Sequence, residues 1–443
     1  MANQGLGGLF RNLGVHRIVG HAIPFFLYRF APYLQGMPVI FAHIVTVSLF
    51  FRLCQLLLES SAIAFLLSLV MAVFPWGHQA LVWLVENTFV LATAFFFGNL
   101  LVLISFSSAH QKQGFAFCAS YLLSLLSLLS NECLLFSLVV SGSIAWFPKG
   151  KFSVEEFKRR AKERYSGWAP LLGVFSYLVC YDLAFRFLTV RPPTKIPHWN
   201  PESILSVPFY QYSHIYVFQG WLSPIARRFI FFEWNGLMFL VSVCLAALFI
   251  VCLHQFAAMA SYREVPSAKP NKTLLFYLIA LIVGACFIYA VGGGYSLDTR
   301  KKYSLIPLLL LLIGYILRTF LSLRISISTK TVPILFVLSM VGVGTTWLNT
   351  GVWRYEVMRY DSLVEFLVGN HIAGDIRVER HPDLYEEWPT LTKMWGIRMV
   401  DDNFVLNEAI LGKGGRPVHV TRGGRGVTVE FDERSSRWRS ESS

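Results

Sequence analysis

Long apolar runs, separated by short polar segments, make up most of this chain. An α-helix rises 1.5 Å per residue, so about 20 apolar residues cross the hydrocarbon core of a bilayer. Several runs reach that length, and others are closer to about 16 residues. They lie at about 38–57, 61–75, 82–106, 114–130, 132–147, 168–188, 235–257, 273–291, 304–322 and 332–350. The pattern predicts an all-α polytopic membrane protein with about ten transmembrane helices.

The two ends of the chain break this pattern. Residues 1–37 are semi-polar and aromatic, and their prolines predict one or two short interfacial helices. Residues 417–431, PVHVTRGGRGVTVEF, alternate in two arms around Gly-Gly-Arg-Gly and predict a β-hairpin. The polar stretch 432–443 is predicted to be disordered. The chain thus divides into an outer-face segment (1–37), a transmembrane domain (38–350) and a small extramembrane α+β tail (351–443).

Composition agrees with a membrane protein. Hydrophobic residues make up 55% of the chain and charged residues 15%, whereas about a quarter is charged in soluble proteins. The net charge of +13 is dispersed among the membrane loops, where it meets anionic lipid head groups, so we exclude nucleic acid as a partner. The seven cysteines lie in apolar runs without a ligand spacing, which favours packing roles, and they indicate nothing about a metal.

A basic cluster behind the run at 132–147 sets the predicted orientation. Between Lys149 and Arg164 the chain carries seven Lys and Arg residues, and such clusters stay on the cytoplasmic side. Successive loops alternate between the two sides of the membrane. Counting from this cytoplasmic cluster therefore places three segments on the outer side: the hinge Ser130–Glu132, the long loop 189–234 and the loop 292–303. We expect a multi-pass integral protein of the cell inner membrane or the endoplasmic reticulum.

The candidate binding residues lie in two of these outer loops. Residues 292–307, GGGYSLDTRKKYSLIP, carry a basic triplet behind flexible glycines, and cationic donors of this kind neutralise a phosphate or pyrophosphate. A lipid-anchoring role, with the side chains reaching the head groups, is the alternative. The candidate phosphate-binding residues are Arg300, Lys301, Lys302, Tyr303, Arg227 and Arg228.

Two further features carry charge inside or beside apolar runs. Asp182 and Arg186 stand at i and i+4, so they share a helix face, where an internal ion pair and a substrate contact are both open. Glu132 sits at the hinge between two predicted spans; buried it would be a functional candidate, and at a solvated turn it would not.

The order of these features resembles the GT-C superfamily of polytopic glycosyltransferases, especially the branch related to protein O-mannosyltransferases. The resemblance spans most of residues 20–370 and rests on five stretches. These are FAHIVTVSLFFRLCQLLL (41–58), FPWGHQALVWLVENTFVLATAFFF (74–97), Ser130-Asn131-Glu132, KYSLIP (302–307) and NTGVWRYEVMRYDSL (349–363). It implies a hexosyltransferase-like enzyme that takes sugar from a polyprenyl phosphate on the outer or lumenal face, with Arg300, Lys301 and Lys302 on the lipid phosphate.

The family's catalytic carboxylate, which acts as a base or binds a divalent metal, lies in a first outer loop behind a first span. Here Gln79, Asn87 and Phe89 fall at family positions for Glu, Arg and Asp, and the first 58 residues contain no acidic residue. The same alternation of loops also places the N-terminus outside. This is expected if a first span lies upstream or if the chain is a shortened, inactive relative.

Three classes of function therefore stay open. The first is a membrane glycosyltransferase-like protein with a polyprenyl-phosphate sugar and membrane lipids as partners. The second is a catalytically inactive GT-C-like membrane protein that binds lipid or a partner. The third is a transporter, although the predicted spans carry few ionisable residues beyond Arg52, Asp182 and Arg186.

Overall fold

The computed structural model describes two separate parts of the chain, Met1–Thr346 and Trp347–Ser443. Helices predominate among the residues that it describes. The described residues are 19, 22, 37–73, 87–106, 110–146, 154–188, 272–291, 303–319, 360–379, 403–421, 427–432 and 437–441.

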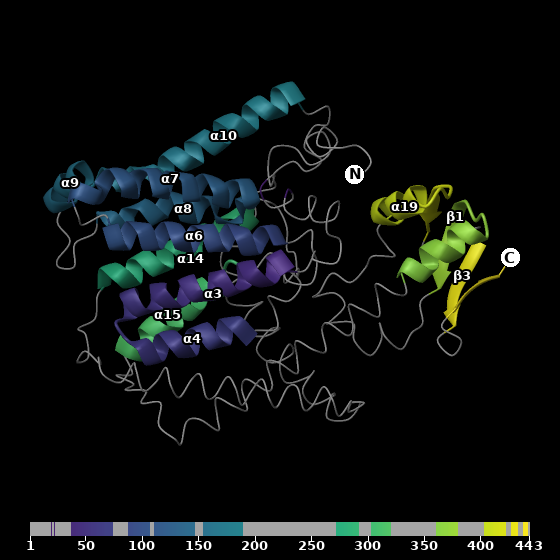
Figure 1. Ribbon diagram of the computed structural model, residues 1–443, viewed down its shortest axis with the longest axis horizontal. Coiled ribbons are helices and arrows are strands. Elements are labelled where there is room, and N and C mark those ends of the chain that lie inside the picture. The colour runs from purple at the N-terminus through teal and green to yellow at the C-terminus, as the bar shows by residue number, and fades with distance from the viewer. Residues whose placement is uncertain are drawn as a thin grey trace, which may run out of the picture. The chain divides into compact units, whose positions relative to one another are not determined.

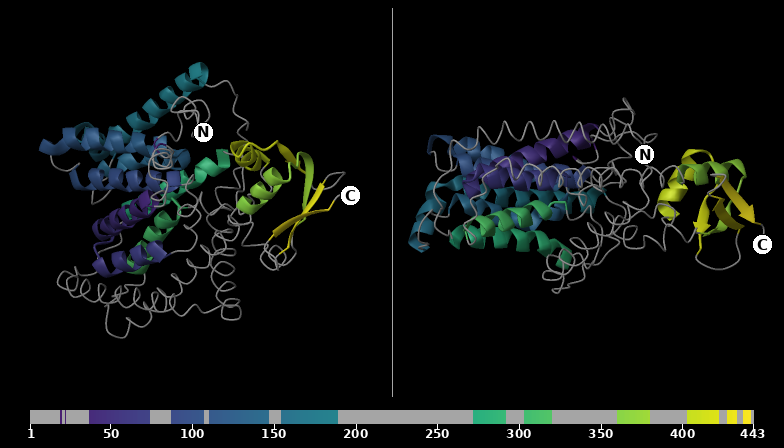
Figure 2. Two further views of the ribbon diagram at one scale, coloured as in Figure 1. Left: turned by 45° about the vertical axis from the view of Figure 1, so that its right-hand side comes forward. Right: turned by 90° about the horizontal axis from the view of Figure 1, so that it is seen from below.

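The first part is a bundle of apolar helices that run side by side (Figure 1). Its longer helices are α3 (Met37–Leu58), α4 (Ser61–Val73), α6 (Asn87–Phe106), α7 (Gln113–Ser130), α10 (Ala169–Leu188), α14 (Lys272–Val291) and α15 (Ile306–Thr319). Its shorter elements are η5 (His110–Lys112), η6 (Glu132–Leu134), α8 (Leu135–Ser141), η7 (Gly142–Ala145), α9 (Val154–Glu163) and η8 (Tyr165–Trp168). In Figure 1 and in the left view of Figure 2, α10 diverges from α7 along its length.

Three of the described helices are long and apolar enough to cross a membrane: Met37–Leu58, Thr88–Phe106 and Gln113–Ser130. Shorter apolar helices lie at Ser61–Ala72, Glu132–Ala145, Lys272–Ile288 and Ile306–Thr319. These helices indicate a membrane protein by their length and composition. The number of ten spans stays a prediction, because the runs at 235–257 and 332–350 lie outside the described residues.

Aromatic and aliphatic side chains lie on both the inside and the outside of the bundle. Phe50, Phe96 and Phe97 are fully buried, whereas Phe41 and Phe276 are 68% and 67% exposed. An apolar outer surface is costly in water and is matched by lipid chains. The exposed phenylalanines are therefore the expected outer surface of a bundle within a bilayer.

Polar groups cross-link the helices inside the bundle. The Asn99 side chain in α6 donates a hydrogen bond to Ser141 Oγ (3.1 Å) and accepts one from Ser120 Oγ (2.5 Å). Tyr277 Oη in α14 donates to the backbone carbonyl of Ser141 (3.2 Å). Helices α6, α7, α8 and α14 are thus joined where hydrocarbon offers no competing water, and such bonds hold membrane helices together.

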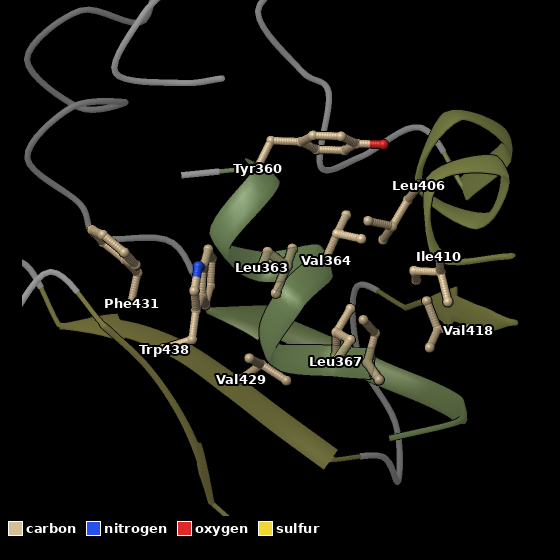
Figure 3. Close-up of a cluster of buried hydrophobic side chains, with 11 residues drawn as sticks. Tyr360, Leu363, Val364, Leu367, Leu406, Ile410, Val418, Val429, Phe431 and Trp438 are labelled. Carbon is tan, nitrogen blue, oxygen red and sulfur yellow. The ribbon is translucent and has the colours of Figure 1, made fainter. Parts of the chain in front are cut away.

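The second part is a small α/β unit. A helix at 360–369 precedes strand β1 (Gly374–Glu379), followed by α19 (Asn403–Gly412), β2 (Val418–Val420), β3 (Val427–Asp432) and β4 (Arg437–Glu441). The sheet has the order β2-β1-β3-β4, with β1 parallel to both neighbours and β3 antiparallel to β4. Figure 3 shows its core, in which Leu363 and Leu367 of the helix pack over Val429 and Trp438 of the strands.

The predicted hairpin at 417–431 is wrong in its pairing. The predicted disorder of residues 432–443 is wrong for 437–441, which form strand β4, and residues 433–436 and 442–443 lie outside the described residues. Strands form where the alternation predicted them, but β2 and β3 lie on opposite sides of β1 and are not partners. The hairpin is the next one along: β3 pairs with β4, in register from Asp432–Arg437 to Thr428–Glu441. The reason is burial, because Trp438 of β4 is only 5% exposed and packs on Phe431.

Candidate functional site: an anchored turn at one end of the bundle

The turn Tyr303–Leu305 leads into α15 and is held by side chains from distant parts of the sequence. Tyr303 is 3% exposed, and its Oη lies 2.6 Å from Nδ1 of His43 in α3. The other ring nitrogen, Nε2, lies 3.3 Å from the backbone carbonyl of Ala72. A carbonyl only accepts, so Nε2 carries the proton and Nδ1 accepts from the Tyr303 hydroxyl. The imidazole therefore connects the turn to the end of α4.

Ser304 makes a second connection, to α6 and η6. Its Oγ lies 2.7 Å from Thr93 Oγ1 and 3.3 Å from Cys133 Sγ. Thr93 Oγ1 donates to the carbonyl of Phe89 (2.7 Å), so its oxygen is left to accept from Ser304. Cys133 Sγ is the second neighbour of Ser304 Oγ. These contacts link η6 through Ser304 and Thr93 to a backbone carbonyl of α6.

The hinge between α7 and α8 belongs to the same site. Asn131 is 1% exposed; its Oδ1 accepts from the backbone N–H of Cys133 (3.0 Å) and its Nδ2 donates to Thr88 Oγ1 (3.2 Å). It thereby caps η6 and fixes it against the start of α6. Glu132 follows and is half-buried. Among the described elements that meet here (α3, α4, α6, η6 and the turn), it is the residue that carries a carboxylate.

The opposite end of the bundle is closed by different contacts. Glu59, between α3 and α4, lies 3.9 Å from Arg318 at the end of α15. Gln113 Oε1 accepts from the backbone N–H of Ser166 (3.3 Å), and Trp146 Nε1 donates to the carbonyl of Arg164 (3.0 Å). The hinge Ser130–Glu132 and helix α9 therefore lie at opposite ends of the described bundle. Their position on opposite sides of a membrane stays a prediction.

The six candidate binding residues are only partly placed. Tyr303 is buried, and its hydroxyl binds His43, so it positions the start of α15. Arg300, Lys301, Lys302, Arg227 and Arg228 lie outside the described residues, and their role in phosphate binding stays a prediction. Asp182 and Arg186 both lie in α10, one turn apart.

His43, Thr93 and Cys133 are site residues that sequence reasoning missed. A signal was present, because a histidine and a threonine inside an apolar run are polar groups that must find partners there. Nothing in the local pattern indicates which partners. The structure supplies them from positions 303 and 304.

The GT-C resemblance allows a divalent metal. Among the described residues no group of three or more His, Cys, Asp or Glu side chains comes together.

Comparisons of the chain with known protein families, with curated proteins and with solved structures found no match. The class of protein follows from the chain alone: a helical bundle with the length and composition of membrane helices, joined in sequence to a small α/β unit.

Proposed function

We propose that this chain is a GT-C-like membrane glycosyltransferase that takes its sugar from a polyprenyl phosphate. The single observation that carries the proposal is the anchored turn. Tyr303 and Ser304 are each 3% exposed and tied to α3, α6 and η6, and the basic triplet Arg300–Lys302 comes directly before them in the sequence. A buried anchor next to a run of cations is a way to position charge for an anionic head group.

Glu132 would supply the acid–base chemistry in this proposal. Transfer of a sugar to a hydroxyl needs a group that accepts the hydroxyl proton, and a carboxylate is suited to that role. The hinge that carries Glu132 is fixed to the anchored turn through the contact of Cys133 with Ser304. The cations would hold the phosphate leaving group while the carboxylate accepts the proton.

The test is transfer of label from a polyprenyl-phosphate sugar in membranes that contain the full chain. We expect the variant Lys301→Ala/Lys302→Ala to lose at least about tenfold in incorporation, since charge-assisted hydrogen bonds contribute about 1.5–3 kcal/mol each. The matched control is Lys112→Ala/Lys272→Ala, which removes two cations from helix starts at the opposite end of the bundle. Equal incorporation by the two variants would remove the basic triplet from the mechanism.

A second candidate, an inactive GT-C-like protein that binds the lipid without transferring sugar, is favoured by one observation. Phe89 falls at the family position for Asp, and its side chain is 3% exposed inside the bundle. Wild-type membranes that retain a polyprenyl phosphate but transfer no label, with Glu132→Gln behaving like wild type, would decide for this candidate.

A further inference from the structure

Helix α9 is fixed to the end of the bundle opposite the anchored turn. The indole of Trp146 donates to the carbonyl of Arg164 (3.0 Å), and the indole of Trp168 donates to the carbonyl of Ala161 (3.2 Å). The two indole rings lie 4.6 Å apart, and Ala161 packs on the buried cluster around Trp146. α9 is therefore a fixed part of the bundle end and not a free linker.

The cations and the carboxylates of α9 lie at different angles around the helix axis, measured from its apolar residues. Its apolar residues Val154, Phe157 and Ala161 recur at helical spacing and define one line. At 100° per residue, Lys158 and Lys162 flank this line on one side and Arg160 on the other, all within roughly 110° of it. Lys158 and Lys162 are exposed, and Arg160 is half-buried.

The acidic residues stand further round the helix. Glu155 and Glu163 lie more than about 125° from the apolar line, and both are exposed. Glu163 also lies 3.7 Å from Arg159, which offsets the one cation on that side. The cations of α9 therefore lie closer to the apolar line than the carboxylates do, and Glu155 follows Lys162 by roughly 20° on the same side of the helix.

Aromatic side chains mark the level of the membrane surface beside α9. Trp168 is 49% and Tyr165 is 44% exposed, and each has an apolar ring with one polar atom. Such rings collect where a bilayer meets water. Phe115 at the start of α7 is 61% exposed and continues the apolar surface from this level along the bundle.

We infer that α9 binds the head groups of anionic phospholipids of the surrounding membrane, with Lys158 and Lys162 on the phosphates. The occupant is an anionic lipid because the cations flank the apolar line and lie closer to it than the carboxylates do. The inference is independent of the proposed glycosyltransferase function, which concerns the other end of the bundle.

The test is lipid binding to the full chain in detergent, measured by native mass spectrometry with phosphatidylglycerol and with phosphatidylcholine. We expect phosphatidylglycerol to bind more tightly to the wild type. Each membrane-adjacent cation contributes about 1 kcal/mol, so Lys158→Gln/Lys162→Gln should weaken this binding by roughly 25-fold. The control Lys413→Gln/Arg416→Gln removes the same charge from exposed positions of the second part and should change nothing.

A charge-conserving variant and a salt titration distinguish the loss of lipid binding from misfolding. The variant Lys158→Arg/Lys162→Arg keeps both charges and should bind like the wild type, and wild-type binding should weaken steeply as salt is raised. Equal affinity of the wild type for the two lipids would overturn the inference. So would equal losses in the Lys158→Gln/Lys162→Gln variant and its control, which would leave the charges with a role in topology alone.

Discussion

The Tyr303 hydroxyl donates to His43 Nδ1 at 2.6 Å across a sequence separation of 260 residues. Through this bond a turn before α15 is held by the first described long helix, and the same imidazole reaches the end of α4. The contact joins the early and late parts of the bundle at one point.

The first prediction concerns this contact. Tyr303→Phe should leave Nδ1 of His43 without its donor and destabilise the protein by about 1–3 kcal/mol, the cost of an unsatisfied buried polar group. Thermal unfolding in detergent measures it. Tyr165→Phe is the control, since that ring is 44% exposed. The double variant Tyr303→Phe/His43→Phe should lose less stability than the sum of the two single variants, because each single change already breaks the hydrogen bond between these residues.

A second prediction concerns the contact between α14 and α8. A Cβ on Gly284 would lie 2.9 Å from the backbone nitrogen of Ser137, so Gly284→Ala forces the helices apart. We expect a loss of about 1–3 kcal/mol. Gly98→Ala is the same change where the nearest atom, in the Leu123 side chain, is 3.5 Å away. It should be neutral or stabilising. Similar melting temperatures for the two variants would contradict the close packing.

Third, Asn407 protects the edge of the small sheet. Its Nδ2 donates to the carbonyl of Val418 and its Oδ1 accepts from the Val418 N–H, both at 2.7 Å. Asn407→Ala should expose these backbone groups, cost about 1–3 kcal/mol and leave an edge open to pairing with other chains. Hydrogen exchange at Val418 is the measurement. The control is Asn370→Ala, because the side-chain amide of Asn370 is exposed. This variant should leave the backbone N–H of Val418 protected from exchange.

Fourth, β4 should be needed for the stability of the second part. Trp438 packs on Phe431 with ring centroids 5.0 Å apart, and its Nε1 donates to Ser362 Oγ (3.0 Å). Trp438→Ala should cost about 3–5 kcal/mol. The exposed neighbour Arg437→Ala should cost little. Protection of β3 amides that survives Trp438→Ala unchanged would show that the last strand is dispensable.

A fifth prediction concerns the sides of the membrane. After Cys118 and Cys180, the exposed cysteines among the described residues, are replaced by serine, one new cysteine is placed in the sequence segment 292–303 and another in α9. We expect an impermeant thiol reagent to label Asp298→Cys in intact cells and to label Glu163→Cys only after lysis. Labelling of Glu163→Cys in intact cells, and of Asp298→Cys only after lysis, would show that the chain has the opposite orientation.

The helices were the easier part to predict from the sequence. The run at 38–57 became Met37–Leu58 and the run at 114–130 became Gln113–Ser130, because length and hydropathy are local properties. The run at 132–147 is broken into η6, α8 and η7. There Gly142 packs so closely on the backbone of Gly167 that a Cβ would clash, a contact that no local pattern indicates.

Pairing was the harder part. The alternation at 418–420 and 427–432 predicted strands, but their common partner β1 lies more than 40 positions earlier, at 374–379. The site shows the same difficulty. His43 and Tyr303 are each visible as polar residues beside apolar runs, yet only the packing of α3 against α15 brings them together. Tertiary contacts, which sequence periodicity does not encode, decide both.

The hydrogen bonds of Tyr303 and Ser304 have a consequence for how the proposed head-group specificity could change. The Tyr303 proton goes to His43 and the Ser304 proton goes to Thr93, so neither hydroxyl has a hydrogen left to offer a ligand. In the proposed function, the turn would therefore position the segment before it, and recognition of the lipid head group would fall to the residues that precede Tyr303 in the sequence. On this proposal, different segments ahead of Tyr303 would give different head-group preferences on the same fold.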